Sequence, residues 1–335
     1  MTKIGIGVIG LGRMGRVYAN FVAGQLDDAE LVAVSDPQPS VLAQYAGVTT
    51  AKDYTALLAD TRVDAVIVTT PTHTHREVVI AAAQAGKAVF CEKPTALTLR
   101  ETDEMIAAVD NAGVLMQIGF MRRFDRAYSE AKRQIDAGVI GTPVMIRSIG
   151  RDPYRTSLEY ANPAASGGLI VDMGIHDFDV VRWLTGDEIQ RVYAETAALV
   201  YPELTTVGDV DNAQITLKFN GGGLGNIEVS RTAKYGYDIR GEVVGTEGAL
   251  QIGYLQETAV LTLTKSGVRH DVVPHFPERF GPAYTAQIAA FVTCVRDDKP
   301  PAVTAQDARA ALQAAIAATR SQHTGQVVSV ADITD

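Results

Sequence analysis

The sequence predicts an α/β protein: a doubly wound, Rossmann-type parallel sheet followed by an α+β domain. In the first third, short runs that are apolar throughout alternate with segments of helical spacing, which is typical of a parallel sheet covered on both faces. After about residue 140, apolar and polar residues alternate between Gly-rich turns, which indicates a large, open and mostly antiparallel sheet. The expected domains are therefore 1–120 and 121–335.

The elements follow from these two patterns. Apolar runs predict strands at 3–10, 30–36, 63–70, 87–92 and 114–120, and helical spacing predicts helices at 13–24, 40–46, 74–85 and 98–111. In the second part, alternation predicts strands at 212–219, 222–232, 237–245 and 259–265, with helices at 167–184 and 304–321.

Composition excludes several classes of function. The chain has 335 residues, 47% hydrophobic and 21% charged, which suits two globular domains. Its net charge of −9 argues against binding a nucleic-acid backbone. No apolar run is long enough to span a membrane, and no export signal is visible. Two cysteines make no disulfide framework, so we expect a cytoplasmic protein.

The segment GLGRMG, residues 10–15, is a G-x-G-x-x-G motif placed between a predicted strand and a predicted helix. That context is the one a dinucleotide-binding turn requires. Gly10 would make the turn, Gly12 would let the backbone approach a pyrophosphate, and Gly15 would allow the helix to pack on the strand. Arg13 and Met14 begin the helix, whose N-terminal N–H groups favour phosphate.

Asp36 ends the second predicted strand, 21 residues after the third glycine. Its carboxylate can accept hydrogen bonds from both hydroxyls of an adenosine ribose, and it would repel a 2′-phosphate. No Arg or Lys follows it in Pro37-Gln38-Pro39. The cofactor is therefore expected to be NAD in preference to NADP.

Two further strand ends carry candidate cofactor residues. Thr70 and Pro71 lie at the C-terminal end of the strand at 63–70, and His75 lies near the start of the next helix. The neighbouring His73 is interpreted as a polar turn residue.

The CEKP segment, residues 91–94, lies at the C-terminal end of the strand at 87–92, so Glu92 and Lys93 are expected at the same sheet edge. Pro94 prevents an immediate helix and restricts the backbone next to Lys93.

The apolar helix expected at 167–184 carries an ionisable stripe. Asp172, Asp179 and Trp183 fall within about 40° of His176 at helical spacing. Burial of such groups costs several kcal/mol unless they are paired or used, so the stripe requires a partner.

The chain resembles the glucose–fructose oxidoreductase/inositol dehydrogenase/rhizopine catabolism (Gfo/Idh/MocA) family. The motifs that carry this resemblance are the Gly-rich motif with Asp36, TPTHTH, CEKP and D-x-G-x-H-x₂-D. GDVDNA at 208–213 and GTEGAL at 245–250 are similar to the same family, so the resemblance covers essentially the whole chain. GFMRRFDRAY (119–128), KYGYDI (234–239) and RFGPAY (279–284) are similar to its inositol 2-dehydrogenase branch.

The resemblance implies NAD-dependent oxidation of a ring hydroxyl of myo- or scyllo-inositol to a ketone, with Lys93, Asp172 and His176 as catalytic residues. His176 suits a general base because an ordinary imidazole titrates near working pH. Asp172 would orient and stabilise its protonated form. Lys93 would stabilise the developing alkoxide.

The resemblance also points to further contacts. Candidate ligands for the other substrate hydroxyls are Arg122, Asp152, Asp179, Tyr235 and Tyr284. A homo-oligomer, a tetramer or a dimer, is expected through the open sheet of the second domain.

Three positions depart from the family pattern: Thr72 stands where Asn is frequent, Gln287 replaces a common Glu, and Gly174 stands where inositol enzymes often carry a bulkier residue. Gly174 leaves the identity of the polyol open. Alternatives are an aldose or another sugar as substrate, and a non-catalytic NAD-sensing regulator. The stripe could also bind a divalent metal, although no further His or Cys cluster supports that interpretation.

Overall fold

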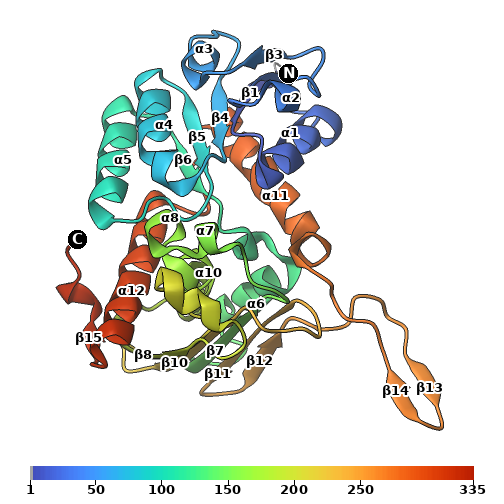
Figure 1. Cartoon of the computed structure of the whole chain (residues 1–335), viewed down its shortest axis with the longest axis vertical. Coiled ribbons are helices and arrows are strands. Elements are labelled where there is room, and N and C mark those ends of the chain that lie inside the picture. Colours follow the sequence, from blue (N-terminus) through green and yellow to red (C-terminus); the bar gives the residue numbers. More distant parts are fainter. Residues whose placement is uncertain (1–2) are drawn as a thin grey trace. The chain divides into compact units, whose positions relative to one another are not determined.

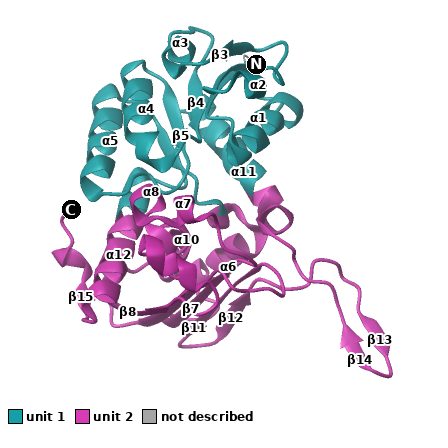
Figure 2. Ribbon diagram, in the orientation of Figure 1, with its two compact units in different colours: residues 1–121, 284–309, 335 teal, residues 122–283, 310–334 magenta. Residues whose placement is uncertain are grey.

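The computed structural model describes residues 3–335, which form two compact units (Figure 2). Unit 1 contains the chain up to Met121 together with residues 284–309 and 335, and unit 2 contains residues 122–283 and 310–334. The chain thus returns to unit 1 near its end, which the sequence patterns did not indicate.

Unit 1 is built on a six-stranded sheet in which every pairing is parallel. The strand order is β3-β2-β1-β4-β5-β6. The order reverses beside β1, and such a switch point is where open α/β sheets bind ligands. The strands are β1 (Ile4–Ile9), β2 (Ala29–Ser35), β3 (Thr49–Ala51), β4 (Ala65–Val68), β5 (Ala88–Cys91) and β6 (Met116–Ile118).

Helices cover both faces of this sheet, with α4 and α5 on one side and α1 on the other (Figure 1). They are α1 (Arg13–Gln25), α2 (Pro39–Leu42), α3 (Tyr54–Leu58), α4 (Thr72–Gln84) and α5 (Leu99–Ala112). The predicted doubly wound fold is confirmed. The helix expected at 40–46 is only the single turn of α2, and β3 and α3 are too short to give a periodic signal.

Unit 2 contains a seven-stranded sheet of order β12-β11-β7-β10-β9-β8-β15. Only the β7–β10 pairing is parallel, so the expected mostly antiparallel sheet is confirmed. The strands are β7 (Pro143–Arg151), β8 (Ile189–Ala197), β9 (Asn212–Phe219), β10 (Leu224–Ser230), β11 (Asp238–Gly245), β12 (Ala249–Ile252) and β15 (Val328–Ser329).

The segment expected as a strand at 259–265 does not join this sheet. Within it, the strand β13 (Thr262–Thr264) pairs with β14 (Gly267–Arg269), and the hairpin projects from unit 2 as an arm (Figure 1).

One face of the unit 2 sheet is covered by helices and the other is polar. Along β9, alternate residues from Ala213 to Phe219 are buried, and the intervening residues are more exposed. The helical elements are η1 (Met121–Phe124), α6 (Arg126–Asp136), α7 (Leu158–Ala161), α8 (Pro163–Ser166), α9 (Gly168–Asp172), α10 (Ile175–Thr185), η2 (Pro202–Val207), α11 (Phe276–Asp297), α12 (Ala305–Thr324) and η3 (Val330–Asp332). α11 and α12 each contain residues of both units.

The prediction of one continuous helix at 167–184 is wrong in one respect, because the structure has two helices there, α9 and α10. The N–H of Gly174 donates to the carbonyl of Leu169, five residues back, which widens the turn where the helix is interrupted. Met173 and Gly174 nevertheless keep right-handed backbone angles. Asp172 at the end of α9 and His176 at the start of α10 therefore remain about one turn apart.

Within residues 3–335, no helix combines the length and the apolar character needed to cross a membrane.

Candidate active site

The Gly-rich turn between β1 and α1 has the geometry that a dinucleotide requires. Gly10 has a φ of +89°, and a Cβ there would lie 2.9 Å from the backbone of Thr69. A Cβ on Gly15 would lie 1.9 Å from the carbonyl oxygen of Gly10, so the helix can pack on the turn only when residue 15 is glycine. A Cβ on Gly12 would meet nothing within 4 Å, and no side chain caps the start of α1. The uncapped N–H groups fit a pyrophosphate.

Asp36 is buried beside this turn and supports it. Its Oδ2 accepts a hydrogen bond from the N–H of Leu11 at 2.8 Å, and its Oδ1 accepts one from the N–H of Gln38 at 2.9 Å. Each carboxylate oxygen has a further lone pair that could accept a ribose hydroxyl. The residue thus has a structural role that its position at a strand end did not reveal.

His75 is buried in the first turn of α4 and connects two strand ends. Its Nε2 lies 2.8 Å from the carbonyl oxygen of Thr70, and its Nδ1 lies 3.0 Å from that of Pro94. Burial lowers the pKa of His75, opposed by these carbonyl oxygens. Both ring nitrogens are occupied within the protein, so any contribution of His75 to cofactor binding is made through the loops it holds. Thr70 also accepts a hydrogen bond from the Thr74 hydroxyl at 2.8 Å, next to Pro71.

Glu92 ties Lys93 to the interior of unit 1. Its Oε2 accepts a hydrogen bond from the backbone N–H of Lys93 at 3.1 Å, and its Oε1 accepts one from the Tyr18 hydroxyl. Gln287 donates to that hydroxyl at 2.8 Å. Burial raises the pKa of Glu92, while Tyr18 and the positive charge of Lys93 act to lower it. The departure at Gln287 thus lies in the network that supports Lys93.

One acid of the predicted stripe, Asp179, is paired with an arginine of η1. Arg123 donates to both oxygens of Asp179, at 2.5 and 3.0 Å, and its guanidinium lies 5.7 Å from the ring centroid of Trp183. Asp179 is 1% exposed. The structure therefore satisfies Asp179 internally, and its predicted contact with substrate stays a prediction.

Arg122 is likewise occupied inside unit 2. Its guanidinium, 2% exposed, donates to Asp177 at 2.6 and 3.4 Å, and the Ser148 hydroxyl donates to the same carboxylate at 2.6 Å. This buried cluster fixes α10 on β7. A direct contact between Arg122 and substrate also stays a prediction.

Asp172 is held by a second buried cluster. The Arg231 guanidinium donates to Asp172 at 2.7 Å and to Asp209 at 3.2 Å, and the Tyr160 hydroxyl donates to Asp172 at 3.0 Å. Asp172 and His176 are each 9% exposed. The sequence patterns did not identify Arg231 or Asp209 as site residues, although GDVDNA, which contains Asp209, was among the family-like segments.

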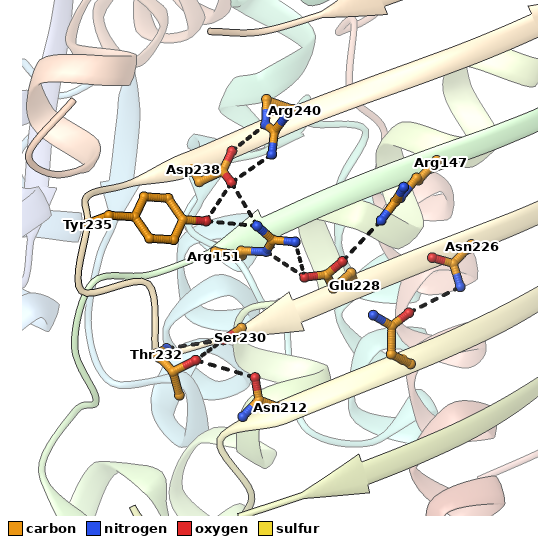
Figure 3. Close-up of polar contacts among 11 residues, drawn as sticks. Arg147, Arg151, Asn212, Asn226, Glu228, Ser230, Thr232, Tyr235, Asp238 and Arg240 are labelled. Atoms are coloured by element: carbon orange, nitrogen blue, oxygen red, sulfur yellow. Dashed lines mark hydrogen bonds and ion pairs between the residues drawn. The ribbon is translucent and has the colours of Figure 1, made fainter. Parts of the chain in front are cut away.

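The remaining predicted residues lie elsewhere. The Tyr235 hydroxyl donates to Asp238 and accepts from Arg151, each at 2.8 Å, within the polar network in Figure 3. Asp152 follows β7, with its backbone bonded to the strand end at Ser230. Tyr284 is buried in unit 1, with its ring centroid 6.4 Å from that of Tyr18.

No group of three or more His, Cys, Asp or Glu side chains that could hold a metal ion occurs among residues 3–335. The acids of the stripe are instead paired with arginines.

Gly174 has no room for a side chain. A Cβ there would lie 2.5 Å from the carbonyl oxygen of Ile170 and 3.3 Å from Cγ2 of Val229. We expect Gly174→Ala to lower the free energy of unfolding by about 1–3 kcal/mol, because a backbone atom must move. Thermal unfolding measures this. Gly24→Ala is the control, because Gly24 lies in α1 with nothing within 4 Å, and should be neutral or stabilising. Equal melting of the two variants would contradict the prediction.

Two family models match the chain. The NAD-binding Rossmann fold of the oxidoreductase family matches residues 4–120, and its C-terminal alpha/beta domain matches residues 132–330. The chain belongs to the Gfo/Idh/MocA oxidoreductase family. Its N-terminal region is therefore the NAD-binding Rossmann domain of this family, in agreement with the Gly-rich turn.

Several relatives of this Gfo/Idh/MocA protein are inositol dehydrogenases. It is 41% identical to the scyllo-inositol 2-dehydrogenase (NAD(+)) of Bacillus subtilis, over 96% of this chain and 95% of that protein. It is 40% identical to the myo-inositol 2-dehydrogenase of Thermotoga maritima, over 98% and 99%. The solved structure of scyllo-inositol dehydrogenase from Lactobacillus casei with bound NAD(H) and scyllo-inositol matches with a TM-score of 0.94 at 32% identity, covering 98% of this chain and all of that one.

Proposed function

We propose that the protein is an NAD-dependent inositol 2-dehydrogenase that oxidises a ring hydroxyl of myo- or scyllo-inositol to a ketone. The observation that carries the proposal is the nearly full-length similarity to two inositol 2-dehydrogenases, in a chain that has Lys93, Asp172 and His176. Mixing protein, NAD and each inositol isomer, with aldoses as competitors, tests it through NADH absorbance. NADH formation with an aldose but with none of the inositol isomers would favour the alternative of a sugar dehydrogenase. No NADH formation with any polyol or sugar would favour a regulator.

In this mechanism, His176 removes the hydroxyl proton and Lys93 Nζ donates a hydrogen bond to the same oxygen as its negative charge develops. Asp172 stabilises the imidazolium that forms. NAD, when bound, would supply the acceptor for the hydride that leaves the carbon. The turn at residues 10–15 and the acid Asp36 would hold the dinucleotide, together with the strand-end residues Thr70, Pro71, His75 and Glu92.

NAD should be preferred over NADP because Asp36 would repel a 2′-phosphate. We expect Asp36→Ala combined with Gln38→Arg to raise the kcat/KM ratio of NADP to NAD by about tenfold or more, since a charge-assisted hydrogen bond contributes about 1.5–3 kcal/mol. NAD turnover should also fall, because Asp36 accepts the N–H of Leu11. Gln38→Arg alone is the control and should keep the preference for NAD. A wild-type protein that uses NADP better than NAD would contradict this assignment.

The same proposal includes a domain boundary between residues 120 and 121 and a cytoplasmic location. It also includes a homotetramer or homodimer that forms through the open face of the unit 2 sheet. Light scattering tests the oligomer, and a monomer would contradict it.

A further inference from the structure

Asp172 lies in a charge cluster that the proposed mechanism does not explain. Arg231 is 1% exposed and its guanidinium contacts two carboxylates, those of Asp172 and Asp209. Two ionised acids against one guanidinium leave the cluster with one negative charge. If Asp172 had Arg231 to itself, the pair would be neutral and could do little to stabilise a protonated His176.

Asp209 is anchored so that it competes for the guanidinium. Its Oδ1 accepts the N–H of Leu169 in the first turn of α9, and its Oδ2 accepts from Arg231. Asp209 is 4% exposed, and burial together with the nearby Asp172 raises its pKa. The contact of Arg231 with Asp172 is the shorter one, 2.7 Å against 3.2 Å.

We propose that Arg231 and Asp209 are positioning residues for the reaction: Arg231 fixes the orientation of the Asp172 carboxylate, and Asp209, by sharing Arg231, leaves Asp172 enough negative charge to support His176 as base. This inference rests on the proposed function of Asp172 and His176. In this cluster, Arg231 therefore determines the orientation of the Asp172 carboxylate, and Asp209 determines how much of its negative charge acts on His176.

The other charged groups around α10 are paired and do not vary in this scheme. On α10 itself, Asp177 is paired with Arg122 and Asp179 with Arg123. Next to α6, Arg279 is paired with Asp125. On α7, Tyr160 donates to Asp172. Also on α10, Arg182 is paired with Glu188, and on β7 Arg151 is paired with Glu228 and Asp238.

The two roles are tested by two variants. Asp209→Asn keeps an oxygen for the Leu169 N–H but removes the competing charge, so Arg231 neutralises Asp172. The pKa of His176 should then fall by about one unit, because the cluster that contains Asp172 loses one unit of negative charge. Because the base must be neutral, the acid limb of kcat/KM should move to lower pH by the same amount. Asp187→Asn, at the other end of α10, is the control and should shift neither.

Arg231→Lys keeps the positive charge but loses the planar fork that contacts both acids. Here the pKa of His176 should stay within a few tenths of a unit, while kcat falls about tenfold or more with little change in the KM for NAD. A merely structural arginine would change the melting temperature without this division between kcat and pKa.

The pKa of His176 is measured by NMR on histidine-labelled enzyme without substrate, with its signal assigned through His176→Asn. This measurement does not depend on inositol turnover, so failure of the proposed function leaves it interpretable. An unshifted His176 in folded Asp209→Asn would overturn the proposal even if the enzyme oxidises inositol. If Asp209→Asn does not fold, an Arg231→Lys enzyme with normal kcat overturns it equally.

Discussion

His176→Ala should lower kcat by roughly 10²–10⁴-fold while NAD still binds. The loss is expected because proton removal belongs to the transition state, and alanine leaves only solvent to accept the proton. In the wild-type enzyme the base must be neutral, so kcat/KM should rise with pH through one ionisation. That limb should be absent in the variant.

The control for this experiment is His323→Ala, an exposed histidine in α12, which should leave kcat and its pH profile unchanged. NAD binding and thermal unfolding show whether the variant is folded. Near-normal turnover in a folded His176→Ala enzyme would rule out His176 as the base.

Asp172→Asn combined with His176→Ala should cost much less activity than the two separate losses would suggest, since residues that act as one unit are not additive. The contact with Arg231 adds a second effect. Removing one charge of a buried pair is expected to lower stability by about 3–5 kcal/mol, so the melting temperature of Asp172→Asn must be measured beside its kcat.

Lys93→Met is expected to lower kcat by about 10²–10³-fold, because it removes the donor to the oxygen that becomes charged in the transition state. The fold should persist, since Glu92 accepts the backbone N–H of Lys93, which methionine retains. The positive charge that lowers the pKa of Glu92 would also be lost, so that pKa should rise further.

Steady-state kinetics and NAD titration separate the possible roles of Lys93. A fall in kcat with little change in NAD affinity supports the assignment, whereas weaker NAD binding with normal kcat would make Lys93 a cofactor ligand only. Lys52→Met, at an exposed position, is the control for loss of a surface lysine and should have no effect.

Local features of the sequence were sufficient for most of the sheet of unit 1 and for its longer helices, but not for β3, α3 or the return of residues 284–309. Its longer strands, such as β1 and β4, are buried on both faces and its longer helices have apolar stripes, so period and composition identify them. The glycines at 10 and 15 each have a steric requirement that matches the prediction from their spacing, whereas a Cβ on Gly12 would meet nothing within 4 Å. Unit 2 was predicted less completely, because β7 and β8 place Arg and Glu on an exposed face and the turn at Gly174 interrupts a helix within a continuous apolar pattern.

By itself the sequence determined the two-part architecture, the dinucleotide-binding turn, and the residues Lys93, Asp172 and His176 as the chemical candidates. Only the tertiary structure decided which arginine meets which acid. Arg123 and Asp179 are 56 residues apart, Arg231 and Asp172 are 59 apart, and Arg279 and Asp125 are 154 apart. Helical and strand periods relate residues only a few positions apart, whereas a buried charge is stabilised by whichever opposite charge the packing brings within hydrogen-bond distance.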